Sequence, residues 1–184
     1  MAIVQRIVEA LRPLVDELVA LTNDDTLKRV SPELRLVYDR QPHAGVLPAL
    51  AAGLEAAQGE RCLAVACDMP FVSRPLFEEM LRHDEDVVIP RTQGYLEPMH
   101  AVYRREPVLA AIREALERGE HRMISYFAVV NVAEIPEDVW QSITPDGRAF
   151  FNVNTPDDLM QAQRLAGLDP SAPSPPEGPR GRTA

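Results

Sequence analysis

Cysteine is scarce in this chain of 184 residues, which contains only two. Cys62 and Cys67 lie in a single apolar run. If that run is a β-strand, the two side chains point to opposite faces, so a disulfide between them is disfavoured. No histidine lies near them in the sequence to complete a structural zinc site. We therefore expect both thiols to be small, buried hydrophobic side chains.

Positive charge is also in short supply. The chain has 19 Lys and Arg residues against 28 Asp and Glu residues, and its net charge is -9. No run of Lys or Arg occurs, which argues against nucleic acid as the main partner because phosphate neutralisation needs clustered cations. No apolar run is long enough to span a bilayer, and no secretory signal precedes the first helical segment. We therefore expect a cytoplasmic protein that binds neither membrane nor nucleic acid.

Glycine-rich nucleotide loops are missing as well. Gly45, Gly53 and Gly59 are too scattered for a Walker loop or a dinucleotide-binding fingerprint. No Gly-x-Ser-x-Gly segment surrounds a serine, so the nucleophile turn of α/β-hydrolases is excluded. A nucleotide bound by so acidic a chain needs backbone amides, one or two cations, or a metal ion held by carboxylates.

What the sequence does contain is an alternation of apolar runs with helical segments. Apolar runs predict strands at 18–21, 34–38, 62–66 and 86–89. Three of the four are nearly continuously apolar, as the central strands of parallel sheets are. Helical spacing of apolar residues predicts helices at 3–11, 46–57 and 74–83. The alternation predicts an α/β fold of three layers, with a doubly wound and mostly parallel sheet.

The second half of the chain is less regular. We expect strands at 98–103, 127–132 and 150–153, a helix at 107–118, and a last helix at 157–166 with Thr155 as its N-cap. Residues 169–184 carry five prolines, and their aliphatic side chains are limited to alanine. Such a segment cannot bury enough surface to offset the entropy of ordering. We therefore expect one α/β domain over residues 1–168, followed by a disordered tail.

Carboxylates follow two of the apolar runs. Asp68 comes just after the run that ends at Ala66, and Asp39 comes after the run that ends at Tyr38. Ligands of open parallel sheets bind at the carboxyl ends of the strands, where a carboxylate can hold a hard cation such as magnesium. We expect Asp68 and Asp39 to lie at the same edge of one sheet. A turn or helix-capping role is the alternative for each of them.

Two further groups are candidates for ligand contacts. Asn152 and Asn154 are two residues apart, so an extended segment would put both amides on one face, where they can bond a heterocycle. Turn chemistry beside the Thr155 cap is the alternative for this pair. A local basic cluster consists of Arg118, His121 and Arg122. The cluster can contact a phosphate group; the alternative is that it is a solvated helix end.

Four segments together resemble the molybdenum cofactor guanylyltransferases of the MobA type. Residues 67–71, Cys-Asp-Met-Pro-Phe after an apolar strand, resemble the metal-binding motif of that family. Residues 151–159, Phe-Asn-Val-Asn-Thr-Pro-Asp-Asp-Leu, resemble its C-terminal signature. Residues 94–104 are similar to its substrate-side strand, and residues 119–123 lie at its Gly-x-x-Arg-Met-like position. The order and spacing agree from the first helix to Leu165.

The resemblance implies transfer of a guanylyl group from GTP to molybdopterin-bound molybdenum, with release of pyrophosphate. Asp68 would be the catalytic carboxylate and would ligate magnesium on the nucleotide phosphates. Asn23, Asp39 and Gly45 would contact the nucleotide. The pterin side of the cleft would comprise Pro98, His100, Arg122, Asn152 and Asn154. Molybdoenzyme chaperones and other cofactor-biosynthesis proteins are the protein partners that such a function suggests.

Two departures from the family pattern bear on activity. The family opens with a strand and a glycine-rich loop that wraps the triphosphate, whereas Met1 and Ala2 lead directly into the first helix here. After Asp39 the chain keeps one glycine, Gly45, and lacks a second glycine that the family has there. Loss of one phosphate donor typically lowers the rate by about 10²–10³-fold. A late start codon, a fragment and a degenerate homologue would each explain the missing loop; we expect an incomplete sequence with weak GTP binding and little transfer.

Two other functions remain open at this point. A cytidylyltransferase or a sugar-phosphate nucleotidyltransferase would use the same fold. A non-catalytic module that holds the pterin cofactor or regulates a partner would combine missing phosphate chemistry with retained Asn152 and Asn154. The Asn-Val-Asn-Thr-Pro segment favours the molybdopterin substrate, while the choice of GTP over CTP depends on the resemblance.

Overall fold

The computed structural model describes residues 2–38 and 45–168. The chain divides into two compact units, Met1–Phe151 and Asn152–Ala184. Asp39 and the predicted tail at 169–184 lie outside the described residues. Within the described ranges, no helix is both long and apolar enough to cross a membrane.

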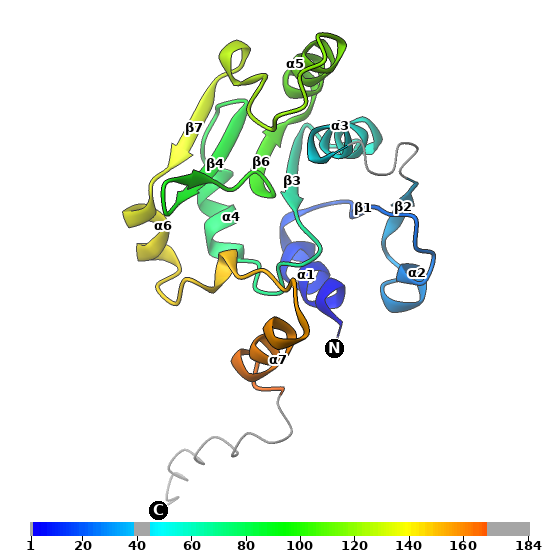
Figure 1. Ribbon diagram of the computed structural model, residues 1–184, viewed down its shortest axis with the longest axis vertical. Helices are drawn as coiled ribbons and strands as arrows, with labels where there is room; N and C mark the ends of the chain where they lie inside the picture. Colours follow the sequence, from blue (N-terminus) through cyan, green and yellow to red (C-terminus); the bar gives the residue numbers. More distant parts are fainter. Residues whose placement is uncertain (1, 39–44, 169–184) are drawn as a thin grey trace, which may run out of the picture. The chain divides into compact units, whose positions relative to one another are not determined.

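The first unit contains two sheets (Figure 1). The larger sheet has the strand order β3-β6-β4-β5, with β7 also paired to β4. Its strands are β3 (Arg61–Val65), β4 (Val87–Thr92), β5 (Tyr95–Leu96), β6 (His100–Arg104) and β7 (Val132–Ile135). β6 runs antiparallel to both β3 and β4, whereas β7 runs parallel to β4. The smaller sheet pairs β1 (Val19–Leu21) with β2 (Arg35–Val37) in parallel.

Helices cover both faces of the larger sheet, which gives the three α/β layers that the sequence predicts. The helices of this unit are α1 (Ile3–Leu11), α2 (Leu27–Val30), α3 (Val46–Ala56), α4 (Arg74–Met80), α5 (Arg105–Glu117) and α6 (Glu137–Ile143). On one face, α3 and α5 contribute Leu47 and Ile112 to a buried cluster. On the other face, α1, α4 and α6 contribute Ile7, Phe77 and Trp140 to a second cluster.

Alternation along the strands divides the core between these two faces. In β4, Val87 and Ile89 belong to the cluster of α3 and α5, whereas Val88 belongs to the cluster of α1, α4 and α6. In β6, Tyr103 and Val102 divide in the same way. Successive side chains of a strand point to opposite faces, so a continuous apolar run serves both clusters at once.

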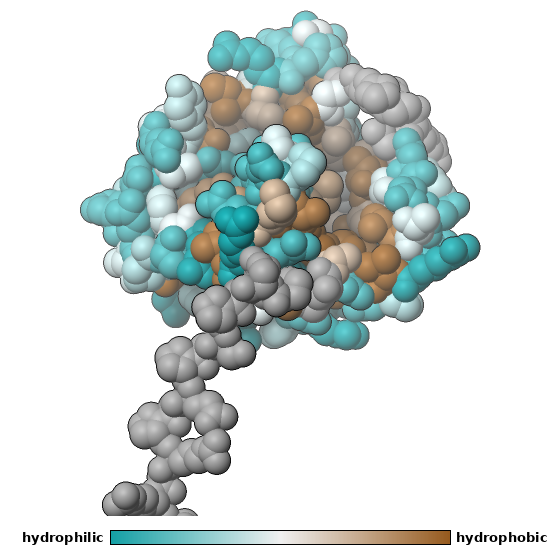
Figure 2. All heavy atoms as spheres, turned by 60° about the horizontal axis from the view of Figure 1, so that its bottom comes forward, coloured by the Kyte–Doolittle hydropathy of each residue, from teal (hydrophilic) through white to brown (hydrophobic). Residues whose placement is uncertain are grey.

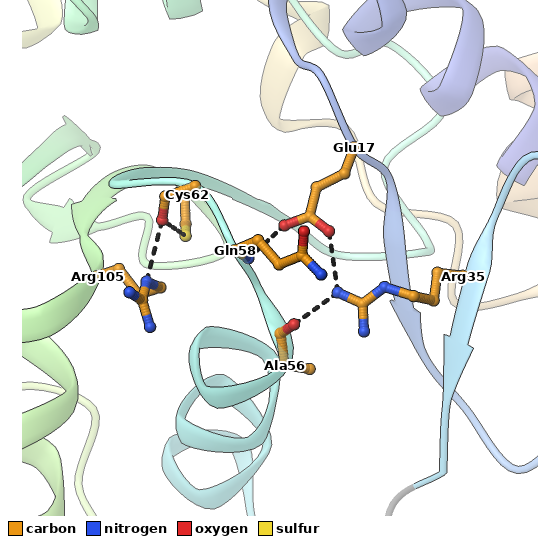
Figure 3. Close-up of polar contacts among 7 residues, drawn as sticks. Glu17, Arg35, Ala56, Gln58, Cys62 and Arg105 are labelled. Atoms are coloured by element: carbon orange, nitrogen blue, oxygen red, sulfur yellow. Dashed lines mark hydrogen bonds and ion pairs between the residues drawn. The ribbon is translucent and has the colours of Figure 1, made fainter.

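In the described part of the chain, no strand pairing joins β1 to β3, so the two sheets stay separate. A polar cluster instead connects the residues at the starts of β1, β2 and β3 (Figure 3). The Glu17 carboxylate accepts hydrogen bonds from the Gln58 backbone N–H and, at 2.9 Å, from the Arg35 guanidinium. These two donors, Gln58 first, lower the pKa of Glu17. The cluster therefore fastens the small sheet to the large one at one edge.

The separation of the sheets leaves β3 less covered than β4. Every residue of β1 and β3 is only partly buried, whereas the first four residues of β4 are buried. The space-filling view shows apolar surface in the middle of one face, inside a largely hydrophilic rim (Figure 2). Within residues 2–38 and 45–168, β3 pairs on one side only, with β6, so its other edge leaves backbone N–H and C=O groups open to a further strand.

Several predicted elements are wrong. Residues 127–132 begin with a 3-10 turn, Phe127–Val129, and the strand follows later at Val132–Ile135. Residues 150–153 form no strand, because the chain makes another 3-10 turn at Arg148–Phe150. The sequence does not predict α2, α6 or β5. It also predicts two buried thiols, whereas Cys62 is partly buried and Cys67 is exposed.

The second unit contains α7 (Pro156–Leu165), as the sequence predicts. The Thr155 hydroxyl accepts a hydrogen bond from the Asp158 N–H at 3.2 Å, and the Asp158 carboxylate accepts one from the Thr155 N–H at 2.9 Å. The Thr155 hydrogen bonds contribute most to lowering the pKa of Asp158. This reciprocal capping box, with Pro156 at the first helical position, explains why the helix begins there.

Candidate active site

Asp68 lies in a tight turn directly after β3. A hydrogen bond of 3.3 Å from the Met69 N–H to the Ala66 carbonyl closes the turn. One carboxylate oxygen of Asp68, Oδ1, is buried and has no hydrogen-bond partner among the described residues. A buried carboxylate oxygen is costly unless a cation or a donor satisfies it. Asp68 therefore fits the cation ligand that the sequence predicts.

The carboxyl ends of β1 and β3 lie at the edge opposite the Glu17 cluster, because both strands begin at that cluster. Asn23 follows β1 in an exposed loop, and Asp68 follows β3. Ligands of α/β sheets bind outside this edge, so both side chains are placed where a nucleotide can reach. The predicted partner Asp39 lies outside the described residues, so its place beside Asp68 stays a prediction.

Gly45 stands immediately before α3 with a φ of 107°. A side chain is strained at that angle, although nothing lies within 4 Å of the place that a Cβ would take. The backbone angle, rather than lack of space, therefore requires glycine here. The first N–H groups of a helix lack partners within the helix and favour anions, which is compatible with the predicted nucleotide contact of Gly45.

The loop between β5 and β6 lies beside the Asp68 turn. In the antiparallel register of β3 and β6, Val65 pairs with His100. One step further, the Ala66 N–H donates to the Met99 carbonyl at 3.0 Å. Residues 97–99 therefore sit at the same sheet edge as Asp68, although they are about 30 residues away in the sequence.

Hydrogen bonds fasten this loop at three further points. The Glu97 N–H donates to the Pro90 carbonyl at 2.9 Å, and the His100 N–H donates to the Glu97 carbonyl at 3.0 Å. The Tyr103 hydroxyl donates to the Pro98 carbonyl at 2.7 Å. The predicted pterin-side residue Pro98 is therefore partly buried in a loop whose backbone is fixed.

The structure places His100, a predicted pterin contact, in the core rather than in a cleft. Its side chain is 0 % exposed. The ring stacks on Phe77 with centroids 4.6 Å apart and meets the edge of Phe150 at 5.2 Å. Neither ring nitrogen has a hydrogen-bond partner among the described residues, and burial lowers the pKa of His100 to about 3. His100 is therefore a neutral aromatic core side chain that supports the loop before it.

Glu97 is the residue of this loop that sequence reasoning missed. Its side chain is partly buried, and burial raises the pKa of the carboxyl group. No hydrogen bond or ion pair to the carboxylate occurs among the described residues, although the backbone of Glu97 is bonded on both sides. The signal available in the sequence was an acidic residue directly before Pro98, inside the segment that resembles the substrate-side strand.

A surface hollow of about 430 Å³ opens beside the segment that follows Asp68. Arg6 and Glu9 of α1 line one side of it, and Pro70 and Phe71 line the other. The Arg6 Nε donates to the Pro70 carbonyl at 3.2 Å, and the guanidinium carbon lies 5.3 Å from the centroid of the Phe71 ring. The hollow combines an aromatic ring with a cation that can meet an anionic group.

The predicted basic cluster is only partly free to meet phosphate. Arg118 donates to both carboxylate oxygens of Glu120, at 3.1 and 3.3 Å, and this contact raises the pKa of Arg118. His121 and Arg122 are exposed in the loop that follows. Arg118 is therefore engaged by Glu120, and the contact with the pterin side predicted for Arg122 stays a prediction.

Asn152 and Asn154 belong to the second unit and are both exposed. The Asn154 backbone N–H donates to the Asp158 carboxylate at 3.1 Å, so this asparagine takes part in the start of α7. The predicted contact of the two side-chain amides with a pterin stays a prediction.

A metal ion at Asp68 would depend on ligands beyond the protein. In the ranges that the structure describes, no group of three or more His, Cys, Asp and Glu side chains converges. Magnesium is commonly held by one or two carboxylates, with water and substrate phosphates as the other ligands. A single carboxylate with an unpartnered oxygen at the sheet edge suits that mode of binding.

Known proteins resemble this chain in sequence. Residues 1–132 match the family described as the MobA-like NTP transferase domain. A probable molybdenum cofactor guanylyltransferase from Chloroflexus aggregans is 33% identical over 172 residues, which cover 90% of this chain and 81% of that protein.

Among solved structures, molybdopterin-guanine dinucleotide biosynthesis protein A from Archaeoglobus fulgidus has a TM-score of 0.72 at 24% identity, covering 90% of this chain and 85% of that one. The 2-C-methyl-D-erythritol 4-phosphate cytidylyltransferase from Thermus thermophilus has a TM-score of 0.67 at 18% identity, covering 90% and 89%. Both likenesses concern the fold, which is that of the nucleotidyltransferases. The matched family model and the relative together show that the chain belongs to the MobA-like NTP transferase family and is a nucleotidyltransferase.

Proposed function

We propose that this nucleotidyltransferase transfers a guanylyl group from GTP to molybdopterin-bound molybdenum, with magnesium held at Asp68. The observation that carries the proposal is the buried, unpartnered Oδ1 of Asp68 at the carboxyl end of β3. Support for the substrates comes from the Chloroflexus aggregans relative, which is named a probable molybdenum cofactor guanylyltransferase.

The proposed reaction is a displacement at phosphorus. An oxygen of the acceptor forms a bond to the α-phosphorus of GTP, the bond from that phosphorus to the bridging oxygen breaks, and pyrophosphate leaves with the electron pair. The protein contributes positioning and charge stabilisation to such a step. Magnesium, when bound, would offset the charge of the phosphates, and Asp68 would hold it there.

Other residues would orient the two substrates. Asn23 and the backbone at Gly45 would contact the nucleotide, together with Asp39. The loop around Pro98 would border the acceptor, and Arg122, Asn152 and Asn154 would contact the pterin side. Cytoplasmic location remains a prediction from the sequence, and protein partners that supply or receive the cofactor remain predictions from the resemblance.

The test is incorporation of label from α-labelled GTP into a molybdopterin dinucleotide, with magnesium present. Asp68→Asn keeps the size of the side chain and removes its charge, so we expect transfer to fall by about 10²–10³-fold. Asp84→Asn, at an exposed aspartate, is the matched control and should leave transfer unchanged. Equal rates for Asp68→Asn and the unmodified protein would refute the role of Asp68.

Other substrates distinguish the related activities. Transfer from CTP in preference to GTP would identify a cytidylyltransferase, and transfer to a sugar phosphate would identify a sugar-phosphate nucleotidyltransferase. Binding of a pterin without any transfer would identify a non-catalytic module. Each of these results would overturn the guanylyl proposal while leaving the family and the fold unchanged.

A further inference from the structure

The carboxylate of Glu97 is unusual because the fold fixes its backbone and leaves its side chain unpartnered. The N–H and the carbonyl of Glu97 are both hydrogen bonded, at 2.9 and 3.0 Å. The carboxylate has no hydrogen bond or ion pair within the described ranges, and its side chain is only partly buried. A partly desolvated carboxylate without a partner is more costly in the free protein than an exposed one. A ligand that supplies donors would remove that cost.

The loop that contains Glu97 lies beside the candidate active site. The Ala66–Met99 hydrogen bond of 3.0 Å joins the strand before Asp68 to the loop of Glu97. Pro98 follows Glu97 directly, and its carbonyl is held by Tyr103 at 2.7 Å. The loop is thus anchored on β4, β3 and β6, so a group that binds Glu97 meets a rigid partner. Rigid support of this kind is what a specificity contact needs.

We propose that Glu97 recognises the 2-amino-4-oxopyrimidine edge of a substrate, an edge that guanine and pterin share. The inference rests on the proposed function, which supplies both heterocycles. That edge presents a ring N–H and an amino N–H side by side. The two carboxylate oxygens accept both in a charge-assisted pair.

A cation is the alternative occupant for Glu97. In the described ranges, no group of three or more metal-ligating side chains converges, so a cation here would depend on ligands from the substrate, as at Asp68. Burial raises the pKa of Glu97, so the charged carboxylate gains from an occupant that compensates its charge. Two N–H donors side by side satisfy both carboxylate oxygens at once, and the magnesium dependence of binding distinguishes the two occupants.

The experiment compares heterocycles that differ at one group. Pterin is paired with lumazine, which has a carbonyl in place of the 2-amino group, and GTP is paired with inosine triphosphate, which lacks that amino group. Binding to the full chain is measured by pterin fluorescence and by calorimetry with magnesium. We expect the unmodified protein to prefer one 2-amino ligand by about 10- to 100-fold.

Glu97→Gln should reduce that preference to within about twofold, because the amide replaces one acceptor by a donor. Loss of the pterin preference would identify the pterin as the source of the edge, and loss of the GTP preference would identify the guanine. Glu97→Asp keeps the charge on a shorter side chain and should lose part of the preference. The matched control, Glu117→Gln at an exposed glutamate of α5, should keep it, and melting temperatures verify that each variant folds.

Two results would overturn the inference. Preferences unchanged in both Glu97 variants would show that other groups read the heterocycle. A change confined to the magnesium concentration needed for GTP binding would make Glu97 a cation ligand instead. If the unmodified protein binds neither GTP nor pterin, the proposed function is refuted together with the role of Glu97. If it binds both and the Glu97 variants bind them equally well, only the role of Glu97 is refuted.

Discussion

We expect the protein to lose stability in mild acid through a single buried side chain, His100. Its ring is 0 % exposed and lies between Phe77 and Phe150, with no hydrogen-bond partner for either nitrogen in the described part of the chain. Burial lowers the pKa of His100 from 6.5 to about 3. A proton on the ring would place a charge in an aromatic environment that offers it nothing in return.

The sign of the effect follows from the direction of that shift. The unfolded chain takes up a proton on His100 below about pH 6.5, whereas the folded protein does not until about pH 3. The contribution of the neutral His100 ring to stability is therefore fully present above pH 6.5 and is lost as the pH falls toward 3. Between about pH 7.5 and about pH 4.5, this one group lowers the free energy of unfolding by about 2.7 kcal/mol, at about 1.36 kcal/mol for each pH unit of the shift.

Urea unfolding at a series of pH values measures this contribution, and Trp140 is a suitable reporter. It is the single tryptophan of the chain, is 4 % exposed, and packs against Phe150 with ring centroids 4.8 Å apart.

Carboxylates also contribute to acid unfolding, so the informative quantity is the difference between the unmodified protein and His100→Phe. Between neutral pH and about pH 4.5, the free energy of unfolding of the variant should fall by about 2.7 kcal/mol less than that of the unmodified protein. This difference does not depend on how stable the variant is at neutral pH. The control His121→Gln, at an exposed histidine, should follow the unmodified protein. Parallel curves for His100→Phe and the unmodified protein would refute the reasoning.

Three further predictions concern other parts of the molecule. Cys67 is exposed and should react with a thiol reagent at once, whereas Cys62 should react slowly because burial raises its pKa; equal rates, read from absorbance, would contradict this. Glu17→Gln should lower the free energy of unfolding by only about 0.5 to 1 kcal/mol, because the carboxylate is partly exposed. If urea unfolding shows no change, the Glu17 cluster does not stabilise the connection between the two sheets. Thr155→Ala removes a helix cap and should cost α7 about 1 kcal/mol, seen as faster amide hydrogen exchange in that helix, with Thr155→Ser as the control that retains protection.

Local chemistry made much of the fold predictable. The apolar run at 62–66 predicts a strand because the same stretch must serve two faces of a sheet, and β3 lies at Arg61–Val65. The Thr155 cap predicts the start of α7 because its hydroxyl can satisfy a free backbone N–H. Asp68 could be recognised as a candidate ligand because a carboxylate after a buried strand lies at the edge where ligands bind. Each inference depends on groups within a few residues of one another.

Long-range contacts decided the rest. The hairpin of β4 and β5 turns at Gln93 and Gly94, both with positive φ, and a glutamine in that position gives a weak turn signal. That β6 runs antiparallel between β3 and β4 depends on strand partners far along the chain. The resemblance of residues 94–104 to a substrate-side strand predicts a site role for His100, but its ring packs against Phe77 and Phe150 in the core. The same register brings the loop of residues 97–99 to the sheet edge of Asp68, because hydrogen bonds between strands, rather than distance along the chain, determine which residues share a sheet edge.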